Sequence, residues 1–284
     1  MKLDDLAVPL IPRSTINCLD LGVMFYGRNL ISILKLWCLF AAPVCLLVYA
    51  GSRVWEWNIL SAIGIVFFTT APFGCILGAR TIHASFGEPF ERYPQSSREL
   101  RQLLVLFLKT LFMRLVTLVG LCFLVIPGWW IGVRSSFMVE KACLSELQGR
   151  RNDRRNSELI GQELGQLIQR SFGILLMLSA VFISLFATID FVATQVLGID
   201  FFWGRVSAVS SDYVEFDQQL EMAGELLLHD PTVLAVISAL LLLIYPIARF
   251  AWFFSYVDLR VRGDFWDLEL RFQKEVDYLQ ETVL

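Results

Sequence analysis

The chain has 284 residues, of which 56% are hydrophobic and 18% are charged, with a formal net charge of −3 and a mean hydropathy of +0.60. A soluble domain of this length cannot bury so much apolar surface, so the excess must face lipid. The composition therefore predicts an all-α, polytopic membrane bundle in a single domain, residues 1–284. Because the basic residues form no soluble basic domain, we do not expect nucleic acid as a partner.

About six transmembrane helices and additional amphipathic interfacial helices are predicted along the chain. A cytoplasmic N-terminal tail and elbow helix, residues 1–29, can begin at a cap provided by Ser14 or Thr15. The apolar stretches that follow predict spans at about 30–50, 58–79, 103–126, 128–144, 172–197 and 232–255. An outer acidic segment is expected at 198–231 and a cytoplasmic C-terminal helix at 256–284.

The fourth predicted span, 128–144, is short and carries charges. The motif Pro127-Gly128-Trp129-Trp130 before it combines a turn signal with two aromatic residues typical of membrane interfaces. It predicts a tight hairpin on the outer face. Whether the span after this turn crosses the whole bilayer stays open.

Positively charged residues set the predicted orientation. Four arginines, at positions 150, 151, 154 and 155, resist translocation and indicate the cytoplasmic side. In contrast, the stretch from Val206 to Pro231 contains acidic residues and no base. Both termini are therefore expected in the cytoplasm. An apolar stripe between Asn156 and Arg170 predicts a further surface helix before the fifth span.

No metal, cofactor or catalytic site is expected. The six cysteines are interpreted as reduced thiols, and His83 and His229 are predicted on opposite faces of the membrane. The chain lacks the recognised motifs of nucleophilic hydrolases, zinc peptidases and nucleotide-binding enzymes. We therefore expect a protein that is not an enzyme.

The candidate functional residues are charges within the predicted spans, because burying a charge in hydrocarbon is costly. The candidate intramembrane network contains Arg114, Arg134, Glu140 and Arg249. Arg134 and Glu140 are six residues apart, which is not a same-face helical spacing, so a bridge would join different spans. The four residues could form a polar path between spans 3, 4 and 6, or structural ion pairs. The scarcity of intramembrane acids favours ion pairs.

A second candidate cluster follows the last span at the inner interface and contains Asp258, Arg260, Arg262, Asp264 and Asp267. Its alternating charges could clamp the C-terminal helix against the spans, or could engage anionic lipid head groups. The clamp is the favoured interpretation.

Two stretches carry a resemblance to a known group. Residues 126–140, Ile-Pro-Gly-Trp-Trp-Ile-Gly-Val-Arg-Ser-Ser-Phe-Met-Val-Glu, and residues 256–270, Tyr-Val-Asp-Leu-Arg-Val-Arg-Gly-Asp-Phe-Trp-Asp-Leu-Glu-Leu, are similar to bacterial six-span proteins. That family resembles the membrane domain of glycerophosphodiester phosphodiesterases. The resemblance implies a bacterial plasma-membrane module without the catalytic barrel, so the hydrolase activity is not carried over.

Two functions remain as hypotheses. The first is a non-catalytic scaffold or partner subunit, associated with membrane lipids and with a protein partner or further copies of itself. The alternative is a small-solute or ion transporter or channel that uses the polar path between spans 3, 4 and 6.

Overall fold

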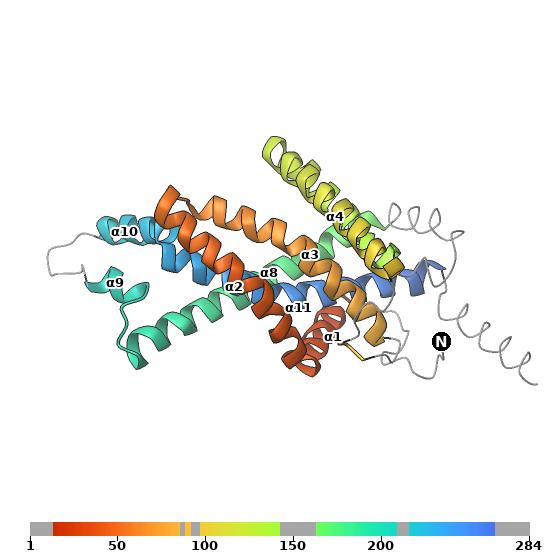
Figure 1. Cartoon of the computed structure of the whole chain (residues 1–284), viewed down its shortest axis with the longest axis horizontal. Helices are drawn as coiled ribbons and strands as arrows, with labels where there is room; N and C mark the ends of the chain where they lie inside the picture. The colour runs from red at the N-terminus through yellow and green to blue at the C-terminus, as the bar shows by residue number, and fades with distance from the viewer. Residues whose placement is uncertain (1–13, 86–88, 92–96, 143–162, 209–215, 265–284) are drawn as a thin grey trace, which may run out of the picture. The chain divides into compact units, whose positions relative to one another are not determined.

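The computed structural model describes residues 14–85, 89–91, 97–142, 163–208 and 216–264 (Figure 1). Within these ranges the regular structure is helical throughout, which confirms the all-α fold. The elements are α1 (Thr15–Arg28), α2 (Leu30–Trp55), α3 (Ile59–Ser85), α4 (Ser97–Phe123), α5 (Val125–Ser135), α8 (Leu164–Phe191), a π-helical turn (Val192–Val196), α9 (Trp203–Ala208), α10 (Phe216–His229) and α11 (Pro231–Asp264).

Five of the described helices are long and apolar enough to cross a membrane, which supports a membrane protein. They are α2, α3, residues Arg101–Phe123 of α4, residues Leu164–Val196 beginning with α8, and residues Pro231–Arg262 of α11. The predicted fourth span, 128–144, does not form a sixth long helix. Its helix α5 has 11 residues, about 16 Å at 1.5 Å per residue, which is shorter than a hydrocarbon core of about 30 Å.

The hairpin between α4 and α5 differs from its prediction. The chain reverses at Leu124, the extended residue that precedes α5, and Pro127 and Gly128 lie in the first turn of α5. Proline is tolerated there because the first helical N–H groups have no partner within the helix. The turn was thus predicted a few residues too late.

The predicted surface helix at 156–170 is not separate from the fifth span. Residues 156–162 lie outside the described ranges, and α8 continues from Leu164 through Arg170 into the span. No proline lies within α8, and Ser171 Oγ donates to the Ile168 carbonyl at 2.8 Å within the helix. One helix therefore replaces the expected pair.

The described helices contribute to two compact units. The first comprises Met1–Ser32, Ala71–Leu175 and Pro246–Leu284, and the second comprises Ile33–Thr70 and Leu176–Tyr245.

In the first unit, the predicted elbow helix forms as α1. Ser14 provides its N-cap, because Ser14 Oγ accepts a hydrogen bond from the Asn17 N–H at 3.3 Å. Phe25 on α1 packs edge-to-face against Phe250 and Phe254 of α11, with ring centroids 5.0 and 6.0 Å apart. This aromatic contact fixes α1 against the last helix.

The second unit has its own apolar core, in which Phe201, Val233 and Ile237 are buried. Two aspartates cap local structure around this core. Asp190 accepts hydrogen bonds from the Phe202 and Trp203 N–H groups, at 2.9 and 3.1 Å. Asp230 caps α11 by accepting a hydrogen bond from the Val233 N–H, and it accepts a second one from Arg205 Nη1 at 2.6 Å. An amphipathic helix was predicted within 198–231, and it is present as α10.

Candidate functional site

A break in the helix that follows the α4–α5 hairpin is the centre of the candidate site. Helix α5 ends at Ser135, residues 136 and 137 form a turn, and helical geometry resumes at residues 138–142. Two serine hydroxyls bond to carbonyls three residues earlier: Ser135 Oγ to Gly132 at 3.1 Å and Ser136 Oγ to Val133 at 2.6 Å. Such side-chain bonds compete with the helical pattern and explain the interruption at this position.

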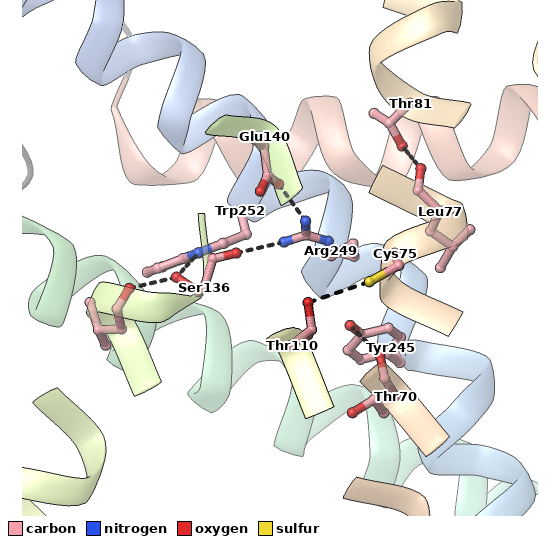
Figure 2. A network of polar contacts seen from close by, with 11 residues as sticks. Thr70, Cys75, Leu77, Thr81, Thr110, Ser136, Glu140, Tyr245, Arg249 and Trp252 are labelled. Atoms are coloured by element: carbon pink, nitrogen blue, oxygen red, sulfur yellow. Dashed lines mark hydrogen bonds and ion pairs between the residues drawn. The ribbon is translucent and has the colours of Figure 1, made fainter. Parts of the chain in front are cut away.

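Two side chains of α11 occupy the break. Arg249 Nη1 donates to the Ser136 carbonyl oxygen at 3.1 Å, and the Trp252 indole N–H donates to Ser136 Oγ (Figure 2). The Trp252 ring also stacks on Phe137, with centroids 5.0 Å apart. The carbonyl and the hydroxyl of Ser136 are thereby both hydrogen-bonded to α11.

Glu140 completes this arrangement. Its Oε1 lies 2.7 Å from Arg249 Nη2, and the two side chains are 0% and 8% exposed. The contact is an ion pair whose angles fall outside hydrogen-bond geometry. Glu140 Oε2 is buried and accepts no hydrogen bond from the described residues. We call Ser136, Glu140, Arg249 and Trp252 the Arg249 joint; all four belong to the first unit.

The backbone of α3 approaches the joint at Gly78. A Cβ atom at this position would lie 2.9 Å from Arg249 Nη2 and 2.7 Å from a methyl carbon of Val139. A glycine is therefore needed for α3 to pack this closely against the guanidinium. One turn earlier on α3, Cys75 lies 3.5 Å from the Thr110 hydroxyl of α4 and packs with Leu106 and Val139.

The structure pairs Glu140 with Arg249, two of the four residues predicted as an intramembrane network. Glu140 and Arg249 form the joint, whereas Arg134 is exposed and places its guanidinium over the Trp130 ring, 5.2 Å from the centroid. Arg114 is partly buried on α4.

At the second predicted cluster, Asp258 is fully buried between two arginines. Its carboxylate accepts hydrogen bonds from Arg170 Nη2 at 2.5 Å and from Arg262 Nε at 3.0 Å. Arg260 is also buried, while Asp264 ends α11 and Asp267 lies outside the described residues. The sequence pointed to Asp258 and Arg262 but missed Arg170, because that residue was assigned to a separate surface helix.

No group of three His, Cys, Asp or Glu side chains suited to a metal ion occurs among the described residues. The chemistry that the two clusters offer is ionic and hydrogen-bonding. Both place an acidic residue against arginine in buried surroundings, where an unpaired charge would be unstable.

Comparisons with known proteins add no family assignment. No protein-family profile, curated protein or solved structure matches the chain.

Proposed function

We propose that the protein is a non-catalytic integral membrane protein that acts as a scaffold or partner subunit of a membrane complex. The burial of the Arg249 joint supports this proposal. Its charges bond to a broken helix and to each other within the protein, so they serve packing. Buried pairs of this kind are weak contributors to net stability but fix one arrangement of the helices they join.

The observation that carries the proposal is the contrast between two spans. In the most apolar 18-residue window of α11, 56% of residues are buried, whereas in the corresponding window of Leu164–Val196 only 6% are buried. Phe172, Leu176 and Ile183 on α8 are each at least 60% exposed. A span that is so little covered by its own chain offers its surface to lipid, to a second copy or to a helix of a partner.

The same proposal includes location and orientation. We place the chain in a bacterial plasma membrane with both termini in the cytoplasm, on the basis of the basic stretch at 150–155 and the acids after Val206. From its resemblance to the membrane domain of glycerophosphodiester phosphodiesterases, we also propose that the chain is a membrane module of that kind without the catalytic barrel.

Photo-crosslinking from α8 tests the partner role. A benzophenone amino acid at Ile183, which is 66% exposed, should crosslink to one partner, whereas the same group at the buried Ile174 should not. Native mass spectrometry of gently extracted protein should then show that partner, or a second copy, at fixed stoichiometry. Lipid adducts alone from position 183, together with a monomer in the mass spectrum, would contradict the proposal.

Transport is a second candidate, because the helix break beside Glu140 is a specific feature that favours it. Broken helices with charged residues line the binding sites of many transporters. On this alternative, proteoliposomes should show a flux of protons or monovalent cations that Glu140→Gln abolishes while the protein remains folded. Absence of flux with the native chain would leave the scaffold as the better account.

A further inference from the structure

The turn that joins α2 to α3 connects two candidate membrane spans. Both helices are long and apolar enough to cross a bilayer, and the turn between them consists of Glu56, Trp57 and Asn58. Between Lys35 and Arg53, the charged residues of α2, the helix rises about 27 Å, which is close to a hydrocarbon core of about 30 Å. In a bilayer, Arg53 therefore marks the depth at which α2 leaves the hydrocarbon, and the turn lies at the membrane surface.

Glu56 holds a backbone conformation that glutamate rarely adopts. Its φ is 53°, and no other non-glycine residue within the described ranges has a positive φ. The side chain of an L-residue is crowded in this left-handed region, and the ends of helices usually place glycine or asparagine there. Backbone strain of this kind is concentrated at binding and catalytic sites. The exposed glutamate side chain is therefore the feature of this turn that needs a physical reason.

Two tryptophans flank Glu56 in the sequence and stack on each other. Trp55 is 65% exposed, and its ring centroid lies 5.5 Å from that of Trp57, with the two planes inclined by 25°. The Trp57 ring packs directly on the backbone of α2 at Gly51, where a Cβ atom would overlap the ring. This contact holds the tryptophan pair at the turn. Tryptophan rings at a membrane surface are typical of the lipid head-group region.

Two opposite charges lie beside this tryptophan pair. Arg53 is exposed and lies over the Tyr49 ring, 5.9 Å from its centroid, and Glu56 is exposed at the turn itself. Neither side chain has an ion-pair partner among the residues that the structure describes. A cation and an anion that lie close together at one membrane surface complement a zwitterionic head group, in which a phosphate is joined to an ammonium by a short carbon chain.

We propose that the α2–α3 turn binds the head group of a zwitterionic phospholipid with a primary ammonium, as in phosphatidylethanolamine, with Arg53 at the phosphate and Glu56 at the ammonium. The primary ammonium donates charge-assisted hydrogen bonds to the carboxylate, which phosphatidylglycerol, a lipid without a cation, does not supply. The strained backbone of Glu56 then serves to direct its carboxylate toward the head group. This lipid site does not depend on the scaffold role, because it requires no protein partner.

A zero-length crosslinker tests the contact in the native chain. A carbodiimide joins a carboxylate to a primary amine that touches it, so in liposomes of phosphatidylethanolamine and phosphatidylglycerol it should form an amide between Glu56 and the lipid. Mass spectrometry of the peptides should find the lipid on Glu56 severalfold more often than on Asp217 or Glu221, two exposed acids of α10. Equal labelling of the three side chains, or no adduct at Glu56, would mean a solvated turn and would overturn the proposal.

The positive half of the site is tested by Arg53→Gln. Without the guanidinium at the phosphate, lipid labelling of Glu56 should fall severalfold. Arg134→Gln is the matched control, because Arg134 also lies over an aromatic ring, that of Trp130, but belongs to α5 and not to the turn. Its labelling should equal that of the native chain. An equal fall in both variants, or no change in the Arg53 variant, would refute the assignment of the phosphate to Arg53.

Thermal unfolding separates a lipid role of Glu56 from a structural one. Asparagine tolerates the left-handed conformation better than glutamate, so Glu56→Asn should unfold at no lower temperature than the native chain in detergent without lipid. Added phosphatidylethanolamine should raise the unfolding temperature of the native chain more than added phosphatidylglycerol does, because a ligand of the folded state stabilises it. The variant should respond equally to the two lipids. A variant that unfolds at a lower temperature without lipid, or that keeps the native lipid preference, would contradict the proposal.

Discussion

Arg249 in the joint and Arg134 on α5 are arginines in opposite surroundings within one unit of the molecule. Arg249 is buried beside a carboxylate and a backbone carbonyl, whereas Arg134 is exposed above an aromatic ring. Both side chains belong to segments of high hydropathy, and from the sequence both were candidates for the same intramembrane network. The surroundings of a charged residue in an apolar segment, and not its presence alone, therefore decide whether it pairs with another helix or stays exposed.

Removal of Arg249 should have the largest effect. Arg249→Met leaves the Glu140 carboxylate buried without its ion-pair partner and the Ser136 carbonyl without its arginine donor. We expect a loss of about 3–5 kcal/mol in the free energy of unfolding. Thermal unfolding in lipid-containing micelles measures this loss.

Arg134→Met is the control for that experiment and should change stability by less than about 1 kcal/mol. Adding Glu140→Leu to Arg249→Met should recover part of the loss, because the uncompensated buried charge is then gone. Equal losses for Arg249→Met and Arg134→Met would remove the distinction between the two regions.

A bulkier residue in the hairpin should have an intermediate effect. Gly128→Leu forces α5 away from the Gly120 and Leu121 backbone, and we expect a loss of about 1–3 kcal/mol. Gly64→Leu on α3 is the control, since nothing lies within 4 Å of a Cβ atom there. Distances between spin labels on α4 and α5 should widen only in the Gly128 variant; unchanged distances would argue against glycine-mediated packing.

A smaller effect is expected from Trp252→Phe. The substitution removes the indole donor to Ser136 Oγ but retains an aromatic ring beside Phe137. Loss of one such bond should cost about 1 kcal/mol in unfolding free energy. Trp203→Phe is the control, because the Trp203 side chain is 62% exposed. Calorimetry should show almost no change in the unfolding free energy for this variant. A larger loss at position 203 than at 252 would contradict the assigned role.

The sequence predicted the fold class and the long helices because hydropathy over some twenty residues is a local property. It located the amphipathic helix within 198–231 for the same reason, and of the two caps it offered, Ser14 and Thr15, the structure uses Ser14. It did not locate the end of α4, because Pro-Gly is a strong turn signal and yet is tolerated in the first turn of a helix. That misplaced turn also hid the G-x-x-x-G spacing of Gly128 and Gly132, which could have been found as an α5 packing motif.

Contacts between distant segments were beyond local patterns. Glu140 and Arg249 are 109 positions apart, and Arg170 and Asp258 are 88 apart. Charge and depth made Glu140 and Arg249 candidates, and the six-residue spacing disfavoured Arg134 as the partner, but nothing in the sequence distinguished Arg249 from Arg114. The break at Ser136, where Arg249 donates to the carbonyl oxygen, has no sequence signal beyond two adjacent serines.

The smallest expected effect is the coupling between Arg134 and Glu140, the two charges that are nearest in sequence. A double-mutant cycle with Arg134→Met and Glu140→Leu should give an interaction energy within about 0.5 kcal/mol of zero, because the Arg134 guanidinium lies over Trp130 and not beside the carboxylate. The cycle of Glu140→Leu with Arg249→Met should instead show coupling above about 1.5 kcal/mol, since those atoms are 2.7 Å apart. Unfolding free energies of the single and double variants in the same lipid mixture give both values. A strong Arg134–Glu140 coupling would mean that Arg134 takes part in the joint, and the two regions would then have to be treated as one network.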